Sequence, residues 1–394
     1  MLDLNVAPTA HPEPEAPTSA DAEVRRHALR ALPAPEPSAG VVAYYRERDL
    51  ALEASPKKRA NYERYLAHKR REAEPDYLPI KLDIENVSRC NFRCIMCSVS
   101  QWHKGKRADD LPLQAFERLI DEQYGLVEIK LQGLGEPTMQ RDPYFDMIRY
   151  ARARHIWVRT TTNASLLHLK DNYRKLVDAD PNEIQISIDG ATKQVFESIR
   201  HGSVFERVVE NCKLLNGYCR ERGVVRTKMW TVVQRANFHQ LADLVRLAAE
   251  LGFKHHTFSL ELVDWGIAEW RAANDTVSVE DQLDPDALMD LIDLGDSLGV
   301  EVRFWNTTDK YSADTPETLC PWPFERAFVS SDLRVVPCCT IGNPDVYQIG
   351  APLDREDPES FTRHWRGEDF VAFRKAHLEG RIPDICKACY ADPE

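Results

Sequence analysis

The run Asn86-Val-Ser-Arg-Cys90-Asn-Phe-Arg-Cys94-Ile-Met-Cys97 places three cysteines on one loop, with the spacing C-x3-C-x2-C. Three thiolates so close together repel one another unless a positive centre neutralises them. A structural zinc site takes four ligands, and most iron–sulfur clusters are also held by four cysteines. The triplet therefore favours an iron–sulfur cluster with one iron left open. A zinc ion that borrows a distant fourth ligand is the alternative.

Strand-like and helix-like patterns alternate on both sides of this loop, as in βα units. Six units in one continuous run predict an α/β fold with a partial (β/α)6 barrel of the TIM type, followed by a small α+β domain. The three-cysteine loop follows the first strand, which puts it at the catalytic face of such a barrel. The expected strands are Ile80–Glu85, Leu126–Gln132, Trp157–Thr162, Glu183–Asp189, Val225–Gln234 and Lys254–Leu260.

Cys90, Cys94 and Cys97, with Met96 at the apolar position, resemble the signature of the radical S-adenosylmethionine (SAM) superfamily. The resemblance implies a [4Fe–4S] cluster whose open iron is chelated by the amino and carboxylate groups of SAM. It also implies that reduction cleaves SAM to methionine and a 5′-deoxyadenosyl radical, which removes a hydrogen atom from an unactivated carbon. Reduced flavodoxin or ferredoxin is the expected electron donor.

Further motifs at strand ends resemble SAM-contacting segments of that family. Gln132-Gly-Leu-Gly135-Glu136-Pro137 resembles the family's G-G-E-P segment and departs from it at Leu134. Glycine there allows backbone to approach SAM closely, and the carboxylate accepts a hydrogen bond from the SAM ammonium. The resemblance also implies contacts from polar residues after later strands, with a guanidinium on the SAM carboxylate. The expected cofactor-binding residues are Met96, Gly135, Glu136, Asn163, Ser187 and Arg200.

A second group of cysteines lies near the end of the chain, with Cys320 and Cys338 flanking an expected hairpin and Cys386 and Cys389 forming a C-x2-C pair. Taken alone, two such pairs suit zinc as well as iron. The sequence motifs around these four cysteines resemble those of the twitch, or short SPASM-like, auxiliary domain of radical SAM enzymes. The resemblance implies one auxiliary [4Fe–4S] cluster held by Cys320, Cys338, Cys386 and Cys389.

These patterns divide the chain into five parts. Residues 1–40 hold seven prolines and nine alanines, a composition typical of a disordered leader. The expected parts are this leader at 1–40, an N-terminal helical extension at 41–77, the radical SAM partial barrel at 78–262, a connecting helix and strand segment at 263–309, and the auxiliary cluster domain at 310–394.

Three cysteines remain outside these two ligand sets. Cys339 adjoins the expected ligand Cys338 and has three interpretations. It could replace Cys338 as a cluster ligand, donate a hydrogen atom to a substrate radical, or be a buried thiol beside the cluster. Cys212 and Cys219 stand at helical spacing and are expected to be packing residues.

The formal charge of −12 argues against nonspecific binding to nucleic acid, which needs lysine and arginine contacts to phosphates. No apolar run approaches the length of a membrane span, and the first residues have no secretory pattern. We therefore expect a cytoplasmic enzyme with no membrane partner.

The expected reaction is oxidation or epimerisation of a hydroxyl-bearing carbon on a sugar or aminocyclitol, as in relatives with this layout. Modification of a ribosomally made precursor peptide is the alternative, and a zinc-bound structural protein is the second. No catalytic base is identified from the sequence. Candidates for the barrel mouth are Gln234, Arg235, His256, Ser259 and Glu261, each of which also suits a structural role.

Overall fold

The computed structural model describes residues 40–67, 71–101, 109–264, 266–279, 282–305 and 310–391. The expected leader therefore lies outside the described residues except for Gly40. Helices α2 (Val41–Ala54) and α3 (Pro56–Ala67) follow it, separated at Ser55, whose backbone is extended. The Tyr44 ring packs edge-on against Trp157, with centroids 5.4 Å apart. This contact seats α2 on the N-terminal end of a barrel strand.

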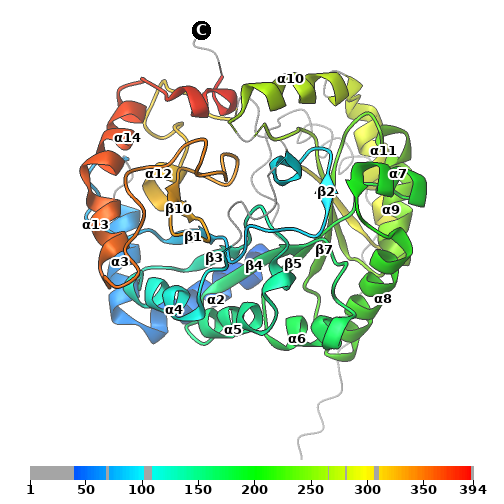
Figure 1. Ribbon diagram of the computed structural model, residues 1–394, viewed down its shortest axis with the longest axis horizontal. Coiled ribbons are helices and arrows are strands. Elements are labelled where there is room, and N and C mark those ends of the chain that lie inside the picture. Colours follow the sequence, from blue (N-terminus) through cyan, green and yellow to red (C-terminus); the bar gives the residue numbers. More distant parts are fainter. Residues whose placement is uncertain are drawn as a thin grey trace, which may run out of the picture.

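The core of the fold is a curved parallel sheet with helices around its outside (Figure 1). All six strands expected for the barrel are present, and each pairs in parallel with the next. A seventh, from the segment expected to connect the two domains, extends the sheet beyond β8. In order the strands are β1 (Lys81–Ile84), β3 (Glu128–Leu131), β4 (Trp157–Thr162), β5 (Glu183–Ser187), β7 (Thr227–Val232), β8 (His255–Ser259) and β9 (Glu301–Trp305).

Amphipathic helices cover the outer face of this sheet. In α4, Ala115, Phe116, Leu119 and Ile120 are buried at the spacing of one helix face. The covering helices are α4 (Leu113–Glu122), α5 (Asp142–Arg152), α6 (Asn172–Asp178), α7 (Lys193–Ile199), α8 (Phe205–Glu221), α9 (Leu241–Glu250) and α11 (Pro285–Ser297), while α10 (Ala268–Val277) lies after β8. No described helix is long and apolar enough to span a membrane.

Strand residues alternate between the two faces of the sheet, because successive side chains in a strand point in opposite directions. On β3, Ile129 is fully buried on one parity and Lys130 is only partly buried on the other. On β4 the apolar Val158 likewise stands beside the charged Arg159, and both are buried. The outer face thus forms the apolar core with the helices, and the inner face is polar.

The C-terminal segment joins the same sheet. After α12 (Trp322–Glu325), strand β10 (Arg326–Val329) pairs in parallel with β1, and β11 (Val335–Val336) returns antiparallel to β10. Helices α13 (Ser360–Arg366) and α14 (Glu368–Leu378) pack beside it. The buried guanidinium of Arg374 donates to the Pro323 carbonyl at 2.7 Å. The cysteine-bearing tail is therefore built onto the first strand of the barrel.

Candidate active site

The three-cysteine loop is held in place by a short two-stranded sheet. Strand β2 (Arg93–Cys94) pairs antiparallel with β6 (Arg200–His201), which follows α7. The Ile95 amide also donates to the Ile199 carbonyl at 2.9 Å. Backbone hydrogen bonds thus fix the middle cysteine against a segment that lies more than one hundred residues later in the chain.

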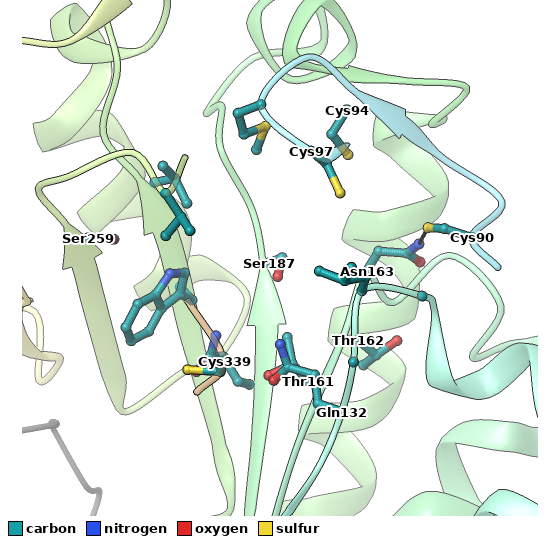
Figure 2. Close-up of a pocket in the computed structure, with 18 of the residues that line it drawn as sticks. Cys90, Cys94, Cys97, Gln132, Thr161, Thr162, Asn163, Ser187, Ser259 and Cys339 are labelled. Carbon is teal, nitrogen blue, oxygen red and sulfur yellow. Dashed lines mark hydrogen bonds between the residues drawn. The ribbon is translucent and has the colours of Figure 1, made fainter. Parts of the chain in front are cut away.

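Cys90, Cys94 and Cys97 all border one cavity at the carboxyl ends of the strands (Figure 2). Burial raises the pKa of Cys90 and of Cys97 to about 12, so these thiols need a positive partner to ionise. A donor set of buried thiols suits an iron–sulfur cluster, whose irons supply that charge. No three of the described His, Cys, Asp and Glu side chains are grouped around the position of a single metal ion.

Gly135 brings the loop after β3 against the three-cysteine loop. A Cβ atom on Gly135 would lie 2.3 Å from the Val87 carbonyl oxygen and 2.5 Å from that of Arg89. The next amide, that of Glu136, donates to the Arg89 carbonyl at 3.0 Å. We expected glycine here because of a close approach to SAM. The described close approach is to the backbone that leads into Cys90.

Glu136 is buried, and both of its carboxylate oxygens accept hydrogen bonds from the protein. Oε1 accepts from the Thr138 amide at 3.2 Å and from the Thr162 hydroxyl at 2.6 Å, and Oε2 accepts from the Asn163 amide at 2.8 Å. Burial raises the pKa of Glu136, and these hydrogen bonds oppose the rise. The carboxylate ties the end of β3 to the end of β4, and a SAM contact would be added to this network.

The other expected SAM residues border the same cavity. Figure 2 shows Asn163 beside Cys90, where the Asn163 amide nitrogen lies 3.9 Å from the sulfur. Arg200 forms a buried ion pair with Asp189 at 2.6 Å, and its Nη1 lies 3.9 Å from the Cys94 sulfur. A direct contact between Arg200 and the SAM carboxylate stays a prediction. The full set on this cavity is Met96, Gly135, Glu136, Asn163, Ser187 and Arg200.

Of the candidates for the barrel mouth, Ser259 and Glu261 border this cavity. His256 is instead buried on the outer face, where the Thr231 hydroxyl donates to Ile188 and lies 2.9 Å from His256 Nε2. Gln234 and Arg235 do not line the cavity. These three residues therefore have no described place at the site.

The inner face of the barrel supplies cavity residues that the sequence reasoning missed. Polar or charged side chains in the middle of strands were the available signal, because a fully buried parallel strand is normally apolar throughout. Cavity-lining residues of this kind are Asp83, Lys130, Arg159 and Gln185, and the rings of Trp230 and Trp305 line the same cavity.

The second set of cysteines gathers at an adjoining cavity. Cys320, Cys338 and Cys389 line it, and Cys386 is near enough to raise the pKa of Cys338. Burial is the largest cause of the raised pKa values, so these thiols too need a cation to ionise, as a cluster would provide. The Cys320 amide donates to the Tyr390 hydroxyl at 2.9 Å, which fixes the loop.

Cys339 lies between the two cavities. It lines both of them, together with Arg159, Trp305 and Thr340. In Figure 2, Cys339 is on the far side of the first cavity from the three-cysteine loop. Cys212 and Cys219 are in α8 and belong to the hydrophobic core, where packing residues are expected.

Two family models match the chain. Residues 87–248 match the radical SAM superfamily, and residues 320–390 match SPASM, an iron–sulfur cluster-binding domain. Among curated relatives, the mycofactocin maturase MftC of Mycolicibacterium smegmatis is 30% identical over 209 residues, which is 52% of this chain and 50% of that protein. A probable GTP 3′,8-cyclase of Saccharolobus solfataricus is 28% identical over 54% of this chain and 67% of that one. The chain thus aligns with about half the length of the maturases.

Solved structures share the fold. Streptococcus suis SuiB bound to the precursor peptide SuiA superposes with a TM-score of 0.56 at 15% identity, covering 89% of this chain and 76% of SuiB. The structure of anSMEcpe with bound AdoMet gives 0.53 at 18% identity, covering 79% and 88%. The matched domains imply SAM, a SAM-binding [4Fe–4S] cluster and an auxiliary cluster as cofactors. The chain belongs to the radical SAM superfamily and carries a C-terminal SPASM-type iron–sulfur domain.

Proposed function

We propose that this enzyme removes a hydrogen atom from a carbon of a peptide substrate and that the resulting substrate radical is then oxidised. The observation that carries the proposal is the pair of adjoining cavities. One is bordered by the three-cysteine loop and the other by the auxiliary cysteines, and Arg159, Trp305, Cys339 and Thr340 line both. A substrate held in the first cavity therefore lies between the two cluster sites.

The peptide class is supported by the relatives. The sequence resembles a mycofactocin maturase, and the fold resembles a structure that holds a precursor peptide. These similarities favour peptide modification over the sugar or aminocyclitol reaction that the chain's motifs first indicated.

The chain's own residues have distinct tasks in this proposal. Cys90, Cys94 and Cys97 hold the SAM-binding cluster, and the β2–β6 pairing keeps them in place. Glu136 fixes the strand ends on which SAM would lie, through the amide of Asn163. When bound and reduced by one electron, SAM supplies the oxidant that takes the hydrogen atom. The fully ligated auxiliary site, which has no open position for substrate, serves electron transfer.

The proposed reaction balances as a two-electron oxidation of the peptide. The substrate C–H bond breaks, its hydrogen atom ends in 5′-deoxyadenosine, and methionine is released. An auxiliary cluster held by Cys320, Cys338, Cys386 and Cys389 would accept one electron from the carbon radical, and a base or water would take one proton. Reduced flavodoxin or ferredoxin supplies the electron that cleaves SAM. Because cluster thiolates need reducing conditions, we propose the cytoplasm as the compartment.

Anaerobically reconstituted enzyme with SAM and a reductant tests this proposal. Precursor peptides encoded beside the gene are incubated in parallel with sugars and aminocyclitols, and 5′-deoxyadenosine and product masses are measured. We expect a peptide to stimulate 5′-deoxyadenosine formation and to become two hydrogens lighter. Turnover of a sugar or aminocyclitol with no change in any peptide would refute the peptide assignment. Solvent deuterium at a substrate carbon would indicate epimerisation instead of oxidation.

A further inference from the structure

A group of charged side chains stands on the inner face of the barrel and borders both cavities. We call it the floor cluster. It comes from alternate residues of β1, β3, β4, β5 and β7, from the last residue of α12 and from the first residue of β10. Its members are the cations Lys81, Lys130, Arg159, Lys228 and Arg326 and the anions Asp83, Glu128, Glu183 and Glu325.

Ion pairs connect most of the floor cluster. Arg159 lies between Glu128 at 3.4 Å and Glu183 at 3.3 Å. Lys228 pairs with Glu183 at 2.7 Å. At the other side, Lys81 pairs with Glu128 and Glu325, and Arg326 pairs with Glu325 and Asp83. All four carboxylates are therefore already used by cations other than Lys130.

Lys130 is the one cation of the floor cluster that forms no ion pair within the described part of the chain. No described residue forms a hydrogen bond or an ion pair with its ammonium group, although it stands in register between Asp83 and Arg159 and borders the first cavity. Burial lowers the pKa of Lys228 to about 8, and repulsion from Lys130 acts in the same direction. The floor cluster thus contains five cations and four anions, and Lys130, the cation without a described partner, borders the cavity.

A partly buried cation without a counter-ion is unfavourable, because desolvation is not offset by pairing. An anionic group in the cavity would offset it. One unpartnered ammonium offsets the single negative charge of a carboxylate, whereas a phosphate group carries nearly two at neutral pH. Trp230 and Trp305, with ring centroids 5.6 Å apart, form an apolar wall of the same cavity.

We propose that Lys130 binds a carboxylate of the substrate, an inference that rests on the proposed action on peptides and names the recognised group. The carboxylate belongs either to an acidic side chain or to the peptide's C-terminus. Bound there, it would place the peptide on the floor of the cavity, with the neighbouring carbons facing the three-cysteine loop.

Isothermal titration calorimetry on the reconstituted, SAM-loaded enzyme tests this inference. The probes are N-acetyl-Ala-Glu-amide against N-acetyl-Ala-Gln-amide, and N-acetyl-Ala-Ala with a free C-terminus against its amide. We expect one carboxylate probe to bind about tenfold or more tightly than its neutral partner, as a charge-assisted hydrogen bond implies. The pair that shows this preference identifies the source of the carboxylate.

Substitutions assign the preference to the lysine. Lys130→Gln should abolish the preference, and Lys130→Met provides a second variant of similar length. Both should melt at or above the wild-type temperature, because the ammonium has no partner in the described protein and its partial burial is unfavourable. The control is Lys175→Gln, which removes a surface lysine paired with Asp142 at 2.7 Å and should leave the preference unchanged.

Equal binding of charged and neutral probes would overturn the inference, as would a preference that persists in both Lys130 variants. Tighter binding of inorganic phosphate than of either carboxylate probe would overturn it too. A Lys130-dependent carboxylate preference in an enzyme that modifies no peptide would instead retain the anion site and refute the proposed peptide substrate. The two failures are therefore distinguishable.

Discussion

Gly135 offers a sharp test of how the two loops at the site depend on each other. In Gly135→Ala the new Cβ would lie 2.3 Å from the Val87 carbonyl oxygen, whereas real Cβ contacts are almost never shorter than 3.0 Å. The two must therefore separate by at least about 0.7 Å. The opposing atoms are backbone, so no side-chain rotation relieves the clash, and an overpacked contact of this kind costs about 1–3 kcal/mol of stability.

The displacement acts on function because it separates the loop carrying Glu136 from the loop carrying Cys90. A shift of about 1 Å in a reacting geometry lowers rates by about one hundredfold. We expect Gly135→Ala to retain much of its iron and sulfide and to form 5′-deoxyadenosine about one hundred times more slowly. Iron, sulfide and the visible absorption measure the cluster, and chromatography measures 5′-deoxyadenosine.

Gly217→Ala is the matched control. Gly217 lies within α8, and a Cβ there would meet only the end of the Arg220 side chain at 3.9 Å. Alanine at this position should stabilise the helix slightly and leave SAM cleavage unchanged. Cleavage by Gly135→Ala within about threefold of the wild-type rate would refute the claim that this backbone contact sets the geometry.

Other substitutions test the remaining parts of the site. Cys386→Ala should retain SAM cleavage and stop product formation, and normal turnover would contradict electron transfer through the auxiliary cluster. Asp189→Ala leaves Arg200 buried without this counter-ion and should lower the free energy of unfolding by about 3–5 kcal/mol, whereas an unchanged denaturation midpoint would contradict that role. Burial lowers the pKa of His256 to about 3, so between pH 6.5 and 3 the unfolded chain binds the extra proton. Protonation of this histidine therefore does not affect the free energy of unfolding above pH 6.5. Below pH 6.5 that free energy should fall by about 1.4 kcal/mol per pH unit. His256→Gln should flatten the fall in melting temperature from pH 6.5 to 5, and an identical fall would contradict this assignment.

Much of the fold follows from local sequence patterns. Strand and helix patterns alternate along the barrel, and the six expected strands all occur in the sheet. These patterns are reliable because each element buries one face, and burial of one face sets the spacing of apolar residues within a short segment. The break between α2 and α3 at Ser55 is similarly local, since the proline at position 56 disfavours helix in the residue before it.

Tertiary pairing decided what local patterns do not encode. The parallel pairing of β10 with β1 joins residues about 245 positions apart and brings the auxiliary cysteines to the barrel wall. Likewise, β9 lies in the segment expected to connect the two domains, and it pairs in parallel with β8 as a further strand of the sheet. The sequence of one strand does not identify the strand with which it pairs, because backbone hydrogen bonds between strands are independent of side-chain identity.

The sequence by itself determined where the two groups of cysteines stand along the chain and predicted the residues around SAM, because ligand spacing and strand-end motifs are properties of short segments. Those residues do border one cavity, while their contacts with SAM stay predictions. Only the tertiary structure decided that Gly135 contacts the three-cysteine loop, that Cys339 stands between two cavities, and that Lys130 has no counter-ion among the described residues. Each of these depends on which strands are neighbours and in what register, since charge balance and close approach are properties of surroundings drawn from the whole chain.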